Sequence, residues 1–193
     1  MMRYKALLVI TLFFCAHILS AQVSLEKEYR IRKDQFPEKA IRLVKEHLTN
    51  YRKLKYYKEI DSSIFYKIKL KKDQLKYSLS FTEDGSLKHI DIEIKAVDIL
   101  EESYQKIMAY LNQQYSSYRI KKMEQQYAVD SSVEKTFKKA FQNLITPQIK
   151  YKFSVRGKQQ STKFQNFEIL FNAEGSWVTL KKSLPPNYDH VLY

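Results

Sequence analysis

Apolar and polar residues alternate with a period of two along much of the chain, which is typical of strands with one covered face. Three such stretches fall in each half of the chain: 64–71, 75–81 and 89–94, then 149–156, 167–171 and 177–180. A weaker strand is predicted ahead of each set, at 54–60 and 118–127. The pattern therefore predicts an antiparallel sheet made from two similar groups of four strands.

A helix is predicted ahead of each group of strands. Pro37 suits the first position of one helix, and Asp98 with Glu101 has the spacing of a capping box at the start of the other. Apolar residues then recur at intervals of three or four. The two stripes are Ile41, Val44, Leu48 and Tyr51, and Leu100, Tyr104, Ile107, Met108, Leu111 and Tyr115. Each half thus has the order helix, then four strands.

The second half carries one additional element. Residues 131–145 have helical spacing, and Ser131 with Glu134 forms another capping box before Val133, Phe137 and further apolar positions. We expect an amphipathic helix inserted between the first and second strands of this half. The last residues, 184–193, are expected to be irregular.

The rare glycines support an internal repeat. The chain has three glycines in 193 residues, and two of them stand in matching hexapeptides, 81–86 and 171–176. Gly85 and Gly175 follow an acidic residue between alternating segments, which predicts hairpin turns with positive φ at glycine. Gly157 is expected in a third turn. The predicted fold is α+β, with two tandem helix-plus-four-strand units at 22–96 and 97–193, helices on one face of the sheet and the extra helix in unit two.

These features resemble the PepSY-like proteins of bacterial envelopes, which are related in fold to the β-lactamase inhibitory protein. The resemblance covers most of residues 34–182 and is carried by a Tyr-x-apolar-x-Phe-x-x-Asp/Glu-Gly hairpin. The matching positions are Tyr77, Leu79, Phe81, Asp84 and Gly85, then Phe167, Ile169, Phe171, Glu174 and Gly175. Phe167 replaces the tyrosine in the second copy. The resemblance implies a binding or inhibitory module with an exposed sheet face.

The first residues have the order of a secretory signal peptide. Arg3 and Lys5 precede an apolar run, which ends at the small residues Ser20 and Ala21. We expect cleavage after Ala21, export to the periplasm or beyond, and no transmembrane helix in the mature chain. Cys15 follows the large Phe14 in the middle of the run, which argues against lipid anchoring. Removal of residues 1–21 would leave a chain without cysteine.

The net charge is +13, and removal of Arg3 and Lys5 with the leader would leave +11. The excess is spread evenly over both units and is mostly lysine, whereas base readout and bidentate phosphate contacts favour arginine. Together with the export signal, this distribution argues against a nucleic-acid partner.

No catalytic or metal-binding motif stands out. His47, His89 and His190 lie far apart without ligand spacing, and no Gly-x-Ser-x-Gly sequence occurs. His89 lies two residues from Asp91, but the sequence places no nucleophile near it. We therefore expect no enzyme activity, no metal and no cofactor. A hydrolase would require a buried histidine or carboxylate pair in a deep cleft.

The feature that suggests function is a basic strand face. Seven residues alternate with apolar positions on the predicted strands and would share the open side of the sheet: Lys67, Lys69, Lys71, Lys76, Lys150, Lys152 and Arg156. We expect a non-catalytic module, an inhibitor of or adaptor for an envelope protein, which binds an acidic envelope protein or a polyanionic envelope component there. The alternatives are lysines that keep exposed strands soluble, and a periplasmic carrier for a small ligand, lipid or glycan with a tyrosine-lined pocket between helices and sheet.

Overall fold

The computed structural model describes residues 27–60, 63–130, 132–159, 163–183 and 190–191. The strands are β1 (Lys27–Ile31), β2 (Arg52–Ile60), β3 (Ile64–Lys72), β4 (Leu75–Thr82), β5 (Leu87–Ile94), β6 (Ser117–Ala128), β7 (Lys150–Lys158), β8 (Gln165–Asn172), β9 (Trp177–Ser183) and β10 (His190–Val191). The helices are α2 (Glu38–His47), α3 (Glu101–Gln114) and α4 (Val133–Phe141), with single 3₁₀ turns η1 (Lys33–Gln35) and η2 (Ala96–Asp98). The expected leader 1–21 lies outside these residues.

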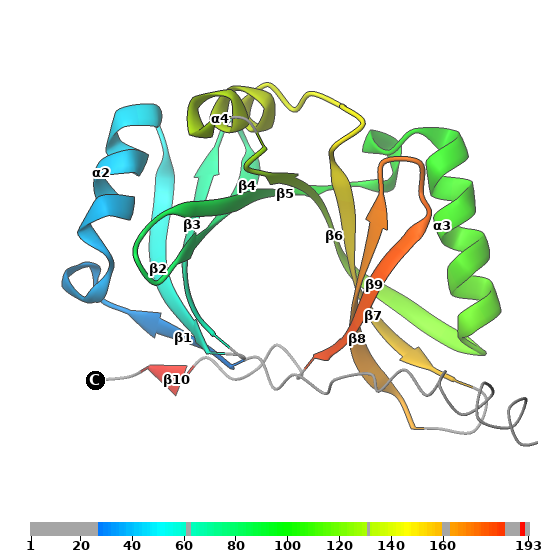
Figure 1. Cartoon of the computed structure of the whole chain (residues 1–193). Coiled ribbons are helices and arrows are strands. Elements are labelled where there is room, and N and C mark those ends of the chain that lie inside the picture. The colour runs from blue at the N-terminus through cyan, green and yellow to red at the C-terminus, as the bar shows by residue number, and fades with distance from the viewer. Residues whose placement is uncertain (1–26, 61–62, 131, 160–162, 184–189, 192–193) are drawn as a thin grey trace, which may run out of the picture.

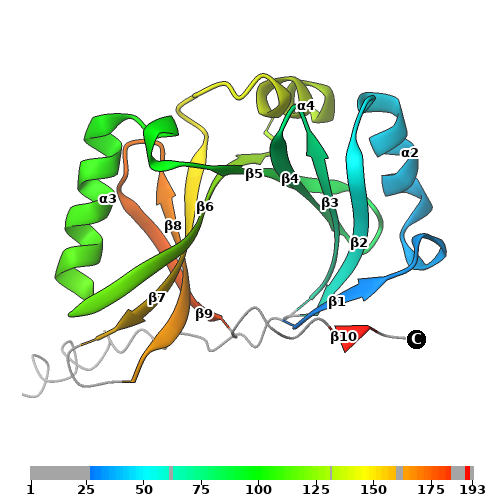
Figure 2. The same cartoon turned by 180° about the vertical axis from the view of Figure 1, so that it is seen from behind.

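The strands of the described part form one sheet in the order β10-β1-β2-β3-β4-β5-β6-β7-β8-β9. Neighbours are antiparallel, except that β10 pairs with β1 in parallel. The sheet curves strongly, and α2, α3 and α4 lie on its outer side (Figure 1). The view from behind shows the same arrangement (Figure 2). The predicted fold class is thus confirmed: each unit is one helix followed by four strands, β2–β5 and β6–β9.

The core lies between the helices and the convex side of the sheet. Strand residues such as Ile68, Phe81 and Phe153 are completely buried, and so are Ile107 and Leu111 of α3. Burial of each large apolar side chain stabilises the fold by about 1.5–3 kcal/mol. Since side chains alternate across a strand, this core directs the intervening polar residues to the concave side.

The glycine hairpins are equivalent in the two units. Gly85 and Gly175 both have φ of +81°, and each donates its N–H to the carbonyl three residues earlier, that of Thr82 or Asn172. The turns also pack on their helices. A Cβ on Gly85 would lie 3.1 Å from Cβ of Lys39, and one on Gly175 would lie 2.3 Å from the Ser103 carbonyl oxygen. Glycine is therefore needed for both its backbone conformation and its size.

Both predicted capping boxes are wrong in detail. The Asp98 carboxylate accepts the N–H of Lys95, the residue just before η2 (2.7 Å), and α3 begins three residues after Asp98. Leu100 consequently precedes the helix and is 54% exposed. The inserted helix spans Val133–Phe141 instead of 131–145. Its start is capped by Ser132, whose hydroxyl accepts the N–H of Lys135 (3.1 Å).

The prediction of a third turn at Gly157 is wrong. This glycine lies within β7, opposite Tyr118 of β6 and Gln165 of β8. A Cβ at this position would lie 2.5 Å from Cδ1 of Tyr115. The glycine therefore makes room for the tyrosine ring that follows α3.

Helix α4 covers the convex side between α2 and α3 (Figure 1). The Phe137 ring stacks on His47 at the end of α2 (4.6 Å between ring centroids). The Phe141 ring contacts Tyr77 of β4 (4.7 Å). The insertion thus belongs to unit two in sequence but packs on unit one, and it ties the two units together.

Two strands were not predicted. β1 is short and charged, and β10 lies in the tail that was expected to be irregular. None of the helices in the described part is long and apolar enough to cross a membrane.

Candidate binding surface on the concave face

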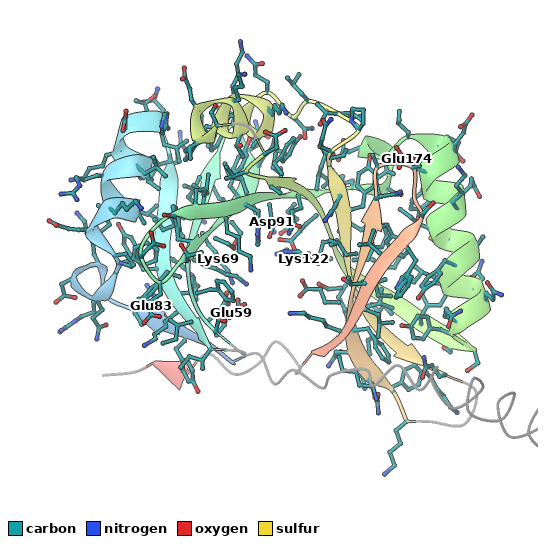
Figure 3. All side chains as sticks on the ribbon, viewed as in Figure 1. Glu59, Lys69, Glu83, Asp91, Lys122 and Glu174 are labelled. Atoms are coloured by element: carbon teal, nitrogen blue, oxygen red, sulfur yellow. The ribbon has the colours of Figure 1, made fainter. Side chains whose placement is uncertain are left out.

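The concave face consists of the strand side chains that alternate with the core. In the described part of the chain the helices lie on the opposite side, so no helix packs over this face. Figure 3 shows Glu59, Lys69, Asp91 and Lys122 directed to this inner side. The surface is therefore formed by strand residues of both units.

All seven basic residues singled out from the sequence lie on β3, β4 and β7 and alternate with core positions. Lys67, Lys69 and Lys71 come from β3, Lys76 from β4, and the rest from β7. The sheet thus brings the two groups to the same concave face. Their role in binding stays a prediction.

Four of these lysines are already paired with carboxylates. Lys67 pairs with Glu59, Lys69 with Glu28 (2.5 Å) and Lys76 with Glu93 (2.5 Å). Lys152 contacts Asp91 and Glu124. The sequence alone could not show these pairs, because most partners lie on strands that are distant in the chain. The concave face is therefore a network of mixed charge instead of a uniformly basic patch.

The other three basic residues have no ion pair among the described residues. Lys71 and Lys150 are partly exposed, and the Arg156 guanidinium lies 5.6 Å from the centre of the Phe164 ring. Of the seven, these are the cations that a partner could reach without breaking an ion pair found in the described part of the chain.

The centre of the face is a buried charge cluster at the junction of the units. The side chains of Lys152, Asp91 and Glu124 are 10%, 1% and 6% exposed, and Asp91 also accepts a hydrogen bond from Gln126 (2.9 Å). Burial opposes ionisation of Asp91, but the charges of Lys152 and His89 outweigh it and hold its pKa well below the ordinary value. Burial likewise opposes the charge of Lys152, yet Asp91 and Glu124 raise its pKa well above normal.

This cluster does not have the properties of an acid–base pair. The pKa of Glu124 is also lowered, because Lys152 and Lys122 outweigh the effects of burial and of Asp91. Both carboxylates are therefore ionised at neutral pH, whereas general acid catalysis needs one of them to hold a proton.

A serine, a histidine and an aspartate do meet beside the cluster. Ser80 lies directly opposite His89 in the β4–β5 register, and His89 Nε2 is 3.5 Å from Asp91 Oδ2. Ser80 Oγ is buried and has no hydrogen-bond partner in the described part of the chain. An activated nucleophile would be hydrogen-bonded to its base, so the arrangement does not show one. The described residues also contain no group of three metal-binding side chains.

Two hollows lie on the described part of this face. One of about 110 Å³ lies over Ser80 and His89. The larger, of about 220 Å³, is lined by residues of β2 to β6, among them Lys53, Lys55 and Lys122. These three lysines were not singled out from the sequence, because only the folded sheet brings residues of β2 and β6 to one hollow with those of β3 and β4.

The tyrosine-lined alternative has little space. A hollow between α2 and the sheet, lined by Tyr51 and Tyr56 among others, has a volume of about 70 Å³. Pockets for small molecules usually measure about 300–1,000 Å³. The arrangement at α2 therefore does not favour a carrier of that design.

Solved structures of similar fold include several from Bacteroides. A DUF2874 family protein from Bacteroides uniformis has a TM-score of 0.53 at 11% identity, over 76% of this chain and 89% of that chain. A protein from Bacteroides eggerthii described as a putative periplasmic protein has a TM-score of 0.52 at 11% identity, over 76% and 88%. A BLIP-like protein from Bacteroides fragilis has a TM-score of 0.50 at 11% identity, over 80% and 92%.

These similarities show a BLIP-like fold. No family model and no curated protein matches the chain.

Proposed function

We propose that this chain is an exported, non-catalytic binding module of the PepSY-like type, which captures an acidic envelope partner on its concave face. The observation that carries the proposal is the concave face, which no helix of the described part covers and on which Lys71, Lys150 and Arg156 have no ion pair among the described residues. Strands of both units contribute these cations, so a partner seated there would contact the two units together. Long-range attraction to an acidic surface would speed its association.

The similar structures support this assignment through their descriptions. One of those proteins is described as putatively periplasmic and another as BLIP-like. A periplasmic location for this chain agrees with the expected leader at 1–21. An inhibitory role is the more specific form of the same proposal.

The test uses charge reversal of unpaired lysines. Lys71→Glu with Lys150→Glu is expected to abolish capture of the partner from an envelope extract of the host. Reversal of Lys67 or Lys152 would be uninformative, because each balances a carboxylate within the fold. The matched control is Lys45→Glu with Lys106→Glu on α2 and α3, which changes the charge equally on the convex side.

Capture should survive in the control, and both variants should retain the unfolding temperature of the wild type to within a few degrees. Undiminished capture by the concave-face variant would refute the proposed surface.

A further inference from the structure

The larger hollow of the concave face lies at one end of unit one and extends to β6. Its lining includes six lysines and two glutamates, with Tyr57, Leu70 and Tyr77 as apolar neighbours. The Lys69 ammonium lies 4.4 Å from the centre of the Tyr57 ring. The hollow thus combines a strongly cationic lining with one tyrosine ring in contact with a lysine.

Only half of its lysines are neutralised within the described residues. Lys69, Lys76 and Lys122 pair with Glu28, Glu93 and Glu124, each at 2.5 Å. The other three lysines have no ion pair in that part of the chain: Lys53, Lys55 and Lys71. Three of the lysines that line the hollow therefore have no counter-charge in the described part of the chain.

The strand register places like charges directly opposite one another. Lys71 lies between Arg52 of β2 and Lys76 of β4, and Lys55 lies opposite Lys69. Such pairs destabilise a sheet. The repulsion would be relieved by an anion bound among them.

The backbone adds a second unfavourable feature at the same place. Lys53 has φ of +55°, which is unusual for a residue other than glycine. It lies in the irregular step of β2 between Arg52 and Lys55. Strained conformations of this kind gather at binding sites, where the surrounding structure fixes a side chain for its ligand. Here the irregular step brings Lys53 to the hollow.

We propose that this hollow binds a phosphoryl group, either free or carried on a larger molecule. A phosphate monoester has a charge of about −1.5 to −2 at neutral pH and three acceptor oxygens, which matches three unpaired ammonium groups. Lysine binds phosphate as a point charge and needs no fork geometry. The volume of about 220 Å³ is below the usual range for a whole small molecule, so the hollow holds one group of its ligand.

The first experiment is a calorimetric titration of the purified chain at low ionic strength. Inorganic phosphate and glycerol phosphate are the probes, and acetate is the monoanionic control. We expect one phosphate site with clearly weaker binding of acetate. Tighter binding of glycerol phosphate than of inorganic phosphate would identify a carried phosphoryl group, and the reverse order would identify the free ion.

The variants Lys55→Met and Lys71→Met remove one charge each and keep an unbranched stem. Each is expected to weaken phosphate binding about tenfold, the usual effect of losing one charge-assisted hydrogen bond. The matched control Lys45→Met on α2 should bind as the wild type does. Unchanged binding in both hollow variants, or no phosphate binding by the wild type, would overturn the proposal.

Thermal unfolding provides a second readout, in which the variant that binds phosphate more weakly is the more stable protein in chloride. Lys71→Met should unfold at a higher temperature than the wild type in chloride, because a like-charge contact is removed. When phosphate replaces chloride at equal ionic strength, the unfolding temperature of Lys71→Met should rise less than that of the wild type, because ligand binding stabilises the folded state. An equal gain in both proteins would also contradict the site.

The proposal goes beyond capture of a protein partner, and Lys71 belongs to both surfaces. The phosphate measurements use the purified chain alone, so their failure would leave open a protein surface that includes Lys150, which does not line the hollow.

Discussion

Lys67 of unit one and Lys152 of unit two occupy the same position of the repeat, but they have different partners. Each lies on the second strand of its unit. Lys67 is paired with Ser80 and Lys152 with Leu170, and these two residues come directly before the equivalent Phe81 and Phe171. On the other side, Lys67 faces Tyr57 and Lys152 faces Glu124. Lys67 then pairs with Glu59 of its own unit, whereas Lys152 pairs with Glu124 and with Asp91 from the other unit.

The difference shows how a repeated element acquires a second role. Unit one has β1 beside its first strand, but unit two has β5 of unit one there. Asp91 of β5 can therefore reach Lys152, and the pair joins the units across the β5–β6 ladder. We infer that the lysine of unit one stabilises a local hairpin, and that the lysine of unit two stabilises the junction.

The largest effect is expected from removal of the junction lysine. Lys152→Met leaves Asp91 and Glu124 buried without their common cation, and such a loss costs about 3–5 kcal/mol. Lys67→Met leaves the less buried Glu59 and should cost about 1–3 kcal/mol. Urea unfolding of both variants measures the difference.

Two further variants check the cause of that difference. Asp91→Asn combined with Lys152→Met should cost less than the sum of the single changes, since the pair is then removed together. Equal costs for the two lysine variants would refute the assignment of the junction to Lys152.

The two glycine hairpins give the next comparison. Gly175→Ala and Gly85→Ala each force a side chain into positive φ, which costs about 1–2 kcal/mol. The alanine at 175 also overlaps the Ser103 carbonyl, and overpacking adds about 1–3 kcal/mol. At 85 the Cβ would meet the Lys39 side chain at 3.1 Å, which needs a smaller adjustment. Gly175→Ala should therefore lower the free energy of unfolding more, and a larger loss for Gly85→Ala would contradict this packing.

The alternation and the glycine repeat predicted the sheet, both units and the inserted helix, because these features depend on local periodicity. Helix starts were wrong at Asp98 and Ser131, since a polar side chain can cap a 3₁₀ turn or stand one residue from the true cap. β1 and β10 are stabilised by pairing with distant strands, and their sequences carry no period of their own. Gly157 was misplaced because only the folded chain brings Tyr115 against it.

The candidate site was predictable only in part. Periodicity predicted seven basic residues on one face, and the structure has them on β3, β4 and β7 at positions that alternate with the core. Periodicity could not show that four of them have acidic partners, because register between strands decides the pairs. For the same reason, the sequence did not indicate that lysines of β2 and β6 line the larger hollow.

Acid unfolding separates the junction from the rest of the molecule. The folded-state pKa of Asp91 lies below its unfolded value of about 3.9, so the unfolded state binds more protons as the pH falls. The stabilisation is complete above the unfolded pKa and is lost as the pH drops toward the folded one. Asp91→Asn should therefore flatten the loss of stability between neutral and acid pH, measured by urea unfolding at several pH values.

The exposed hairpin of unit one provides the control for this pH dependence. Hydrogen bonds from Ser86, Thr82 and Lys39 also lower the pKa of Asp84. Because its surroundings are open to solvent, Asp84→Asn should change the acid profile less than Asp91→Asn. Flattening should persist when Asp91→Asn is placed in the Lys67→Met background. Its disappearance there would mean that the two lysines share one network.

The smallest change in the free energy of unfolding is expected at the helix residue that each hairpin glycine contacts. This residue is Ala40 in α2 and Ser103 in α3, each three residues after the helix cap, Pro37 or Leu100. Ser103 Oγ donates a buried hydrogen bond to the Ala173 carbonyl (2.8 Å), for which Ala40 has no hydroxyl. Ser103→Ala should cost about 1 kcal/mol in urea unfolding. The control Ser116→Ala removes a similar but exposed hydrogen bond to the Lys158 carbonyl and should cost less. If Ser103→Ala costs nothing, this hydrogen bond does not help to hold the second hairpin on its helix. In unit one that contribution comes from Lys39 of α2, which donates to Asp84 and Ser86 of the hairpin.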